Sequence, residues 1–145
     1  MFEKILIATD GSEYSERAAR VAIELAKLGG GSLTALYVAD TSKITHLPDD
    51  MLLFSIRDLL TREGKEAVSF IEKLAIEAGL AFEKIVLEGN PGEKIIEYAK
   101  DAGMSVVVMG SVGRTGLDKF LLGSVAEKVV RNSKVPVLTV PKEAA

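Results

Sequence analysis

The chain has 145 residues, 48% of them apolar, which is the size of one ordinary domain with a sizeable core. Its 18 basic and 21 acidic residues are interleaved and give a net charge of −3, and the lack of a basic block argues against DNA or RNA binding as the main function. The absence of cysteine excludes disulfides, thiolate catalysis and cysteine metal sites; with an apolar strand almost at Met1 and no apolar run near ~18 residues, we expect a cytoplasmic protein without a signal peptide or membrane span.

The first half of the chain alternates between predicted strand and predicted helix. A short apolar run at residues 5–8 ends at Asp10-Gly11-Ser12, and apolar residues then recur at helical spacing as far as Leu28, before a run of glycines. A second strand is predicted over 33–38. A long helix follows a polar connection and ends at Gly79. The apolar face predicted for this helix consists of Ile56, Leu59, Leu60, Ala67, Phe70, Ile71, Leu74 and Ala78.

An apolar cluster at the start of this long helix, Met51–Phe54, has two interpretations. The one we favour is packing in the core, which is the default for large apolar side chains. The alternative is a lid over a ligand crevice or a contact with another subunit.

The second half of the chain continues the alternation. A third strand is predicted over 81–87. Asn90-Pro91-Gly92-Glu93 then combines an N-cap asparagine, a proline in the first turn and a glutamate after the cap, which together predict a helix start. A fourth strand at 105–109, a loop with several glycines, a fourth helix at 125–132 and a fifth strand at 135–140 complete the chain.

Five strands joined by four helices predict an α/β protein with a doubly wound, Rossmann-like parallel sheet and helices on both faces. The expected strand order is 3-2-1-4-5, in a single domain over residues 1–145. In such sheets the ligand sits at the carboxyl ends of the strands, where the winding direction reverses. Strands one and four both precede glycine-bearing turns, so as neighbours they would bring Asp10-Gly11-Ser12 and the glycine loop to one crevice.

The glycine loop has the pattern Gly110-x2-Gly113-x9-Gly123-Ser124 between an apolar strand and an amphipathic helix. Glycines let backbone amides approach a ligand closely, because no Cβ stands in the way. The helix that follows offers unpaired N–H groups and the positive end of its dipole, which suit a phosphate. The loop therefore indicates a nucleotide site built largely from main-chain donors.

Ala8-Thr9-Asp10-Gly11-Ser12 and this glycine pattern resemble the ATP-binding branch of the universal stress protein family, over essentially the whole chain. The resemblance implies that Asp10 and the backbone at Val38 contact ribose and adenine of an adenine nucleotide, with ATP expected, and that the glycine loop holds its phosphates. The residues that carry these roles are Asp10, Val38, Gly110, Gly113, Gly123 and Ser124, and the adjacent Thr9, Met109 and Val125 are expected to complete the site. Two positions depart from many relatives: Thr9, expected to lend mainly its backbone, replaces proline or valine, and Val112 replaces histidine.

Several of these residues also have simpler interpretations. Asp10 alone would start a turn, but opposite the glycine loop we favour a ligand contact, with either a ribose hydroxyl or a divalent cation such as Mg²⁺ or Mn²⁺. Ser124-x-x-Glu127 has the pattern of a capping box, which would explain the serine as an N-cap. We expect Ser124 to contact a phosphate as well. In the loop, Arg114 beside Gly113 is a better phosphate partner than Lys119, and two solvated charges are the alternative.

Turnover has little support in the sequence. One histidine and no cysteine leave too few ligands for the usual zinc sites, and the nucleophile-elbow and P-loop patterns are both missing. No base or water-positioning group is evident beyond Asp10. We favour a non-enzymatic ATP-binding regulator of the stress response over a slow ATPase or nucleotide-hydrolysing enzyme, and over a ligand-free dimeric scaffold. A receiver domain is rejected, because Glu88-Gly89-Asn90 offers no phosphoacceptor aspartate after strand three.

The last strand predicts a partner. Pro136 near its start removes a ladder donor, which suits an edge strand, and a bare apolar edge invites pairing with another chain. Relatives in the family commonly dimerise through this strand. We therefore expect a homodimer through residues 135–140, with an adenine nucleotide as the small-molecule partner and with neither nucleic acid nor membrane as a partner.

Overall fold

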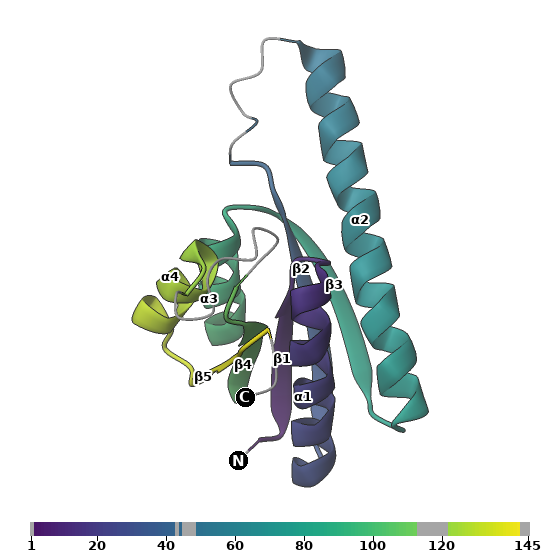
Figure 1. Cartoon of the computed structure of the whole chain (residues 1–145), viewed down its shortest axis with the longest axis vertical. Coiled ribbons are helices and arrows are strands. Elements are labelled where there is room, and N and C mark those ends of the chain that lie inside the picture. The colour runs from purple at the N-terminus through teal and green to yellow at the C-terminus, as the bar shows by residue number, and fades with distance from the viewer. Residues whose placement is uncertain (1, 43, 45–48, 113–121, 143–145) are drawn as a thin grey trace.

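A parallel sheet forms the middle layer of the molecule (Figure 1). The structure is a computed structural model and describes residues 2–42, 44, 49–112 and 122–142. Within these residues the sheet has five strands in the order β3-β2-β1-β4-β5, and every neighbouring pair is parallel. The strands are β1 (Lys4–Thr9), β2 (Ser32–Asp40), β3 (Phe82–Gly89), β4 (Val106–Gly110) and β5 (Val137–Val140). The predicted strand order is confirmed, with β1 and β4 adjacent at the switch point.

Helices cover both faces of this sheet (Figure 1). In the described part of the chain they are α1 (Glu13–Gly29), α2 (Asp50–Glu77), α3 (Pro91–Asp101) and α4 (Ser124–Asn132). α1 and α2 pack on one face, and α3 and α4 pack on the other. None of these helices combines the length and the apolar character that crossing a membrane requires, within the residues described.

The central strand β1 serves two separate cores. Ile5 and Ile7 belong to the apolar cluster under α1 and α2, whereas Leu6 and Ala8 belong to the cluster under α3 and α4. All of them are at most 7% exposed, because successive side chains of a strand point to opposite faces and both faces are covered. Burial on both sides explains why β1 has a continuous apolar run instead of alternating apolar and polar residues.

The strand register brings the functional turns together. Ala8 of β1 lies beside Leu36 of β2 on one side and beside Met109 of β4 on the other. Since neighbouring strands are only ~4.8 Å apart, the residues that follow all of these strands must meet at one edge of the sheet. Asp10 therefore lies between the end of β2 and Gly110, the last residue of β4.

Several element ends agree with the sequence prediction. Asn90 is the N-cap of α3, and its side chain accepts a hydrogen bond from the backbone N–H of Glu93 at 3.1 Å. Gly103 follows the C-cap of α3 with φ of +65°, a conformation that favours glycine. β5 is an edge strand as predicted, although it begins at Val137, after Pro136.

The start of α4 differs from the prediction. Its N-cap is Gly123, no described side chain caps it, and Ser124 is the first residue of the helix. The predicted capping box is therefore wrong, because the helix begins one residue earlier than expected and the serine lies inside its first turn. Within the described part of the chain, no side chain therefore takes up the backbone donors at this end of α4.

The prediction that the cluster Met51–Phe54 packs in the core is also wrong. Met51 is 81% exposed and Phe54 is 71% exposed, because α2 is longer than the strands it covers and its first turns extend past the sheet (Figure 1). Leu28, Leu59 and Phe70, which the sequence placed on apolar helix faces, are exposed as well. The buried stripe of α2 consists of Gly64, Val68, Ile71 and Ala75.

Candidate functional site

A cavity of about 450 Å³ lies at the carboxyl ends of β1, β2 and β4. Its walls include residues of these strands, Leu60 of α2, Pro91 and Ile95 of α3, and the first turn of α4. The position is the one expected for a doubly wound sheet, where the helices on the two faces diverge at the switch point. The cavity is therefore the candidate site.

All predicted site residues that the structure describes line this one cavity. They are Thr9, Asp10, Val38, Met109, Gly110, Gly123, Ser124 and Val125. Gly113 and Arg114 lie outside the described residues, as does Lys119. The two turns, about a hundred residues apart in the chain, thus contribute to the same hollow.

One side of the cavity is apolar. Leu36 and Val38 project from β2, Met109 from β4 and Ile95 from α3, and all of them belong to the core cluster under α3 and α4. Such a surface suits a flat, weakly polar group, because its burial removes apolar area from water.

A chain of hydrogen bonds holds the turn after β1. The backbone N–H of Gly11 donates to Thr9 Oγ1 at 3.1 Å, Thr9 Oγ1 and Ser15 Oγ lie 2.8 Å apart, and Ser15 Oγ donates to the carbonyl oxygen of Ser12 at 2.8 Å. Because the only hydroxyl proton of Ser15 goes to Ser12, Thr9 must donate to Ser15. The bonds therefore run in one direction through two buried hydroxyls. Thr9 uses its side chain here, beyond the backbone role that the resemblance implied.

Asp10 belongs to this turn and also faces the cavity. Its Oδ1 accepts a hydrogen bond from the backbone N–H of Ser12 at 2.9 Å, so the turn-forming interpretation of Asp10 is correct. The amides of Gly11 and Ser12 are both engaged within the turn. The turn therefore presents a carboxylate to the cavity, whereas backbone donors come from the opposite wall.

The opposite wall is the beginning of α4. Gly123 is buried, and its N–H donates to the carbonyl oxygen of Ser111 at 2.7 Å, which ties the helix start to the end of β4. Ser124, Val125 and Ala126 occupy the first turn and line the cavity. The N–H groups of a first turn have no partner within their own helix, and together with the helix dipole they favour an anion.

Gly110 also has a purely structural reason to be glycine. A Cβ at this position would lie 3.1 Å from the carbonyl oxygen of Val112 and 3.4 Å from that of Tyr14. The chain turns tightly here, so a larger residue would displace backbone whether or not a ligand is bound.

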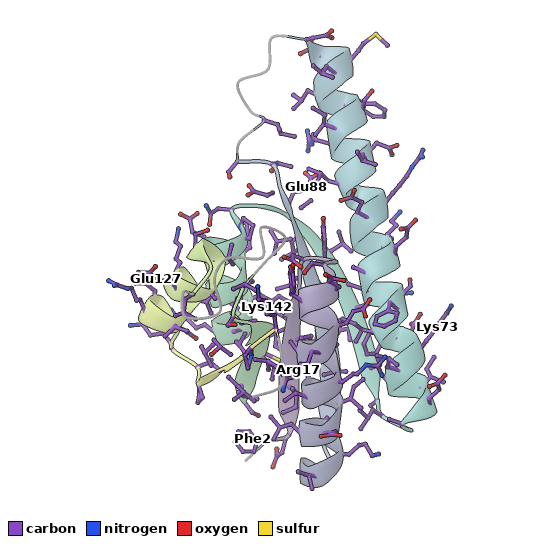
Figure 2. The ribbon with its side chains drawn as sticks, viewed as in Figure 1. Phe2, Arg17, Lys73, Glu88, Glu127 and Lys142 are labelled. Atoms are coloured by element: carbon purple, nitrogen blue, oxygen red, sulfur yellow. The ribbon has the colours of Figure 1, made fainter. Side chains whose placement is uncertain are left out.

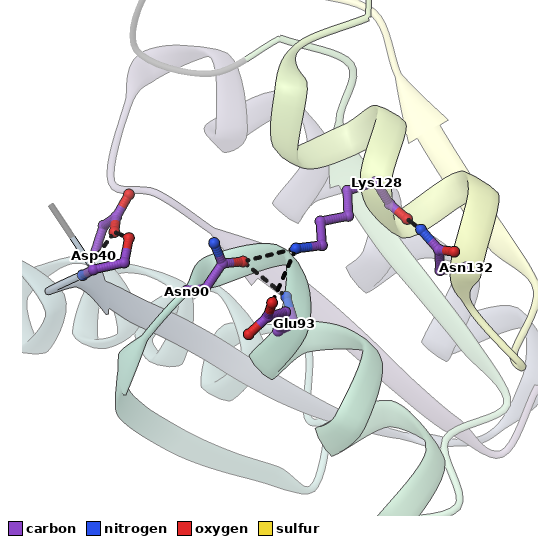
Figure 3. Close-up of polar contacts among 6 residues, drawn as sticks. Asp40, Asn90, Glu93, Lys128 and Asn132 are labelled. Carbon is purple, nitrogen blue, oxygen red and sulfur yellow. Dashed lines mark hydrogen bonds and ion pairs between the residues drawn. The ribbon is translucent and has the colours of Figure 1, made fainter.

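A polar cluster on the outer side of the cavity connects α4 to α3 (Figure 3). Lys128 Nζ of α4 donates to Asn90 Oδ1 at 3.5 Å and to Glu93 Oε1 at 3.3 Å. Its aliphatic stem passes so close to Gly92 that a Cβ there would lie 2.8 Å from Lys128 Cδ. The contact fixes the first turn of α3, including Pro91, relative to α4.

A second ion pair connects α2 to the sheet. Arg57 donates to Glu88 at the end of β3 through two hydrogen bonds, Nη2 to Oε2 at 2.6 Å and Nε to Oε1 at 3.3 Å. Glu88 lies next to α2 (Figure 2). The hydrogen bond from Arg57 lowers the pKa of Glu88 below its ordinary value. The pair holds α2 one turn before Leu60, the residue with which this helix reaches the cavity.

The sequence analysis missed several cavity residues. Leu36 and Asp40 lie two positions before and after Val38 on β2, so the period of a strand would have placed them on the same wall. Pro91 follows a strand end and a helix cap, which is also a detectable signal. Leu60 had no such signal, because its position depends on the path of α2 over the sheet. Among the described residues, no three acidic or histidine side chains are grouped so as to hold a metal ion.

Comparison with known proteins agrees with this architecture. Over residues 1–141 the chain matches the Universal stress protein family. Universal stress protein MJ0531 of Methanocaldococcus jannaschii is 42% identical over 142 residues, which cover 98% of this chain and 84% of that protein. The solved structure of MJ0577, from the same organism, has a TM-score of 0.87 at 33% identity and covers 100% of this chain and 99% of that one. A universal stress protein solved in complex with cAMP is 25% identical, with a TM-score of 0.67 and 98% of both chains covered.

Proposed function

This chain belongs to the universal stress protein family, and from that premise we propose that it is an ATP-binding regulatory protein of the stress response without efficient turnover. The observation that carries the proposal is the polarity of the cavity. An apolar wall at β2, the carboxylate of Asp10 and the start of α4, which no described side chain caps, follow one another along the sheet edge. These suit the base, the ribose hydroxyls and the phosphates of one nucleotide.

The proposed roles follow from this arrangement. Asp10 accepts hydrogen bonds from ribose hydroxyls or holds Mg²⁺ or Mn²⁺ that bridges to phosphate oxygens, and the backbone at Val38 meets the adenine. The phosphates lie against the glycines, the first turn of α4 and Arg114. The residues assigned to this second group are Gly110, Gly113, Gly123, Ser124 and Val125, while Thr9 and Met109 shape the wall between.

A relative supports the choice of an adenine nucleotide. The structure with cAMP shows that a protein of similar fold holds an adenine nucleotide. ATP in particular is supported by the spacing Gly110-x2-Gly113-x9-Gly123-Ser124, through its resemblance to the ATP-binding branch of the family. The cavity of about 450 Å³ falls within the range of roughly 300–1,000 Å³ typical of small-molecule sites.

Calorimetric titration of the purified protein with Mg-ATP, paired with a phosphate-release assay, tests the proposal. We expect one nucleotide bound per chain and no steady release of phosphate. Continued phosphate release would show that the protein is a slow ATPase and not a non-enzymatic regulator. No binding of ATP, ADP or AMP would leave a ligand-free scaffold as the function.

Ser124→Glu provides a test of the phosphate end. Ser124 is exposed and lines the cavity, so a carboxylate there should repel the phosphates and weaken ATP binding by at least about tenfold. The same carboxylate should raise the stability of the free protein slightly, because it lies at the positive end of the α4 dipole. Val130→Glu, at an exposed position later in α4, is the matched control and should leave the affinity unchanged.

The proposed assembly is a homodimer through β5. This strand is one of the two edges of the described sheet, and Leu138 on it is 40% exposed. Antiparallel pairing with the β5 of a second copy would satisfy the edge and cover the leucine. Sedimentation at micromolar concentration should show a dimer, and Leu138→Arg should shift the species toward monomer. A monomeric native protein would rule this assembly out.

A further inference from the structure

Asp40, the last residue of β2, extends the wall where the base is proposed to lie. Leu36, Val38 and Asp40 are alternate residues of one strand, so their side chains point to the same face, and all of them line the cavity. Asp40 is half-buried. The apolar wall therefore ends in a carboxylate at its outer rim.

This carboxylate is held in a fixed position. Ser42 donates to Asp40 Oδ1 twice, from its backbone N–H at 3.2 Å and from its Oγ at 2.5 Å. Asp40 also pairs with Gly89 of β3 in the sheet register, beside the turn that contains Asn90 (Figure 3). No donor within the described residues reaches the other carboxylate oxygen, Oδ2. An ionised carboxylate only accepts hydrogen bonds, so a ligand that covers Asp40 must supply a donor.

The strand order gives the ligand a direction. Asp40 and Gly110 end the strands β2 and β4, and Asp10 follows β1 between them. The two carboxylates therefore lie at adjacent strand ends, and the amides of α4 lie beyond the third strand end. Two strand spacings amount to roughly 10 Å, which is comparable to the separation of base and phosphate in a nucleotide. Donors are thus required at the β2 end of the ligand and acceptors at the α4 end.

We propose that Asp40 is a specificity residue that accepts a hydrogen bond from the exocyclic amino group of the bound base. This inference rests on the proposed function and names the part of the nucleotide that β2 reads. A base with a carbonyl or a bare C–H at that place would leave Asp40 covered and without a donor. The amino group is therefore a requirement of the site and not merely tolerated by it.

The test compares ATP with purine riboside triphosphate, which lacks only the amino group, by calorimetry on the native protein and on Asp40→Ala. The native protein should bind ATP about tenfold more tightly, the difference expected of a hydrogen bond to a charged group at a partly exposed site. In Asp40→Ala the two affinities should become nearly equal. Removal of a negative charge strengthens the binding of any triphosphate, but this effect cancels in the ratio because both ligands carry the same phosphates.

Two further variants make the result decisive. Asp40→Asn keeps the shape of the side chain and should reduce the ratio only in part, which covers the case in which Asp40→Ala fails to fold. Glu83→Gln removes an exposed carboxylate from the neighbouring strand β3 outside the cavity and should leave the ratio unchanged. Tight ATP binding with a ratio that Asp40→Ala does not change would overturn this inference and leave the proposed function standing. Failure of the native protein to bind either nucleotide would overturn both.

Discussion

At the scale of single residues, the turn after β1 is the part of the site with the most defined chemistry. Thr9 and Ser15 are 8% and 5% exposed, and their hydroxyls connect the Gly11 amide to the Ser12 carbonyl. Asp10 is held between them by the same turn. The position of the carboxylate thus depends on a hydroxyl that the resemblance alone gave no reason to expect.

Thr9→Val should show this dependence. Valine has nearly the shape of threonine but removes the acceptor of the Gly11 N–H and the donor to the buried Ser15 hydroxyl, so we expect a loss of about 1 kcal/mol in the free energy of unfolding. ATP binding should weaken as well, because the turn that carries Asp10 loosens. Urea denaturation and calorimetry measure the two effects. Thr9→Ser, which keeps the hydroxyl, should recover most of both, and equal stability of the valine variant and the native protein would contradict the role.

Single residues also show where sequence reasoning reaches its limit in the site. Asp10 and Gly123 were predicted because one follows a strand and the other precedes a helix, and the sheet topology brings such positions together. Val38 was expected from the family resemblance. Asp40 could have been found from its spacing to Val38. Leu60 could not, since the cavity includes it only through the path of a helix whose buried stripe depends on tertiary packing.

At the scale of elements, the cavity depends on how α4 is placed against α3. Lys128 spans the two helices, whereas the ion pair of Arg131 with Glu127 remains within α4. The two lysine contacts are partly exposed, and such pairs contribute little to global stability. Their effect should therefore appear mainly in the alignment of the α4 amides with the ligand.

Lys128→Met tests this alignment. Methionine keeps an aliphatic stem over Gly92 but removes the contacts with Asn90 and Glu93. We expect ATP affinity to fall several-fold while the unfolding free energy changes by less than about 1 kcal/mol. Arg131→Met removes the same charge from the same helix and should leave the affinity as it is. Equal affinities of the two variants would show that Lys128 has no positioning role.

The ion pair of Arg57 and Glu88 should make the stability of the protein depend on pH. Its hydrogen bond lowers the pKa of Glu88 in the folded protein, so the contribution to stability is present above the unfolded pKa of a glutamate and disappears as the pH falls through the lower folded value. Titration of the Glu88 carboxyl by ¹³C NMR should give a pKa below that of a model glutamate. Arg57→Gln should return it toward the ordinary value, and an unchanged titration would show that the pair does not persist in solution.

Element boundaries were predicted well where the signal was local. Asn90 begins α3 as expected, since its cap depends only on its own side chain and the next turn. The start of α4 was misplaced because a glycine can occupy the N-cap without a side-chain hydrogen bond, which left the serine pattern misleading. Met51–Phe54 was wrongly assigned to the core because helical periodicity does not reveal that the first turns of α2 extend past the end of the sheet.

At the scale of the whole molecule, the fold rests on β1. Leu6 is fully buried at the centre of the sheet, in the core under α3 and α4 that also forms the floor of the cavity. The order of the strands could be predicted from the chain because β1 and β4 are buried on both faces and therefore apolar throughout. The C-terminal segment is attached to the same body, through Arg17, which donates to the Pro141 carbonyl, and through Lys142 over the Tyr14 ring (Figure 2).

Leu6→Ala should therefore destabilise the entire domain. We expect a loss of about 2–5 kcal/mol in the free energy of unfolding, because the cavity left at the centre of the sheet has no neighbour free to fill it. Denaturation followed by circular dichroism and by fluorescence of the tyrosines should give coincident transitions. A loss below about 1 kcal/mol would show that the two cores are more adaptable than their burial indicates.

The cavity is formed by a turn near residue 10 and a helix start near residue 124, so it exists only when the whole chain is folded. Any molecule held there consequently recognises only the native state and shifts the folding equilibrium by mass action, by about 2.7 kcal/mol at a free concentration one hundred times its dissociation constant. A cell whose pool of that molecule falls would lose this protection and, with it, part of the lifetime of the protein against proteolysis. The abundance of the protein would then report on metabolic supply without any separate sensor.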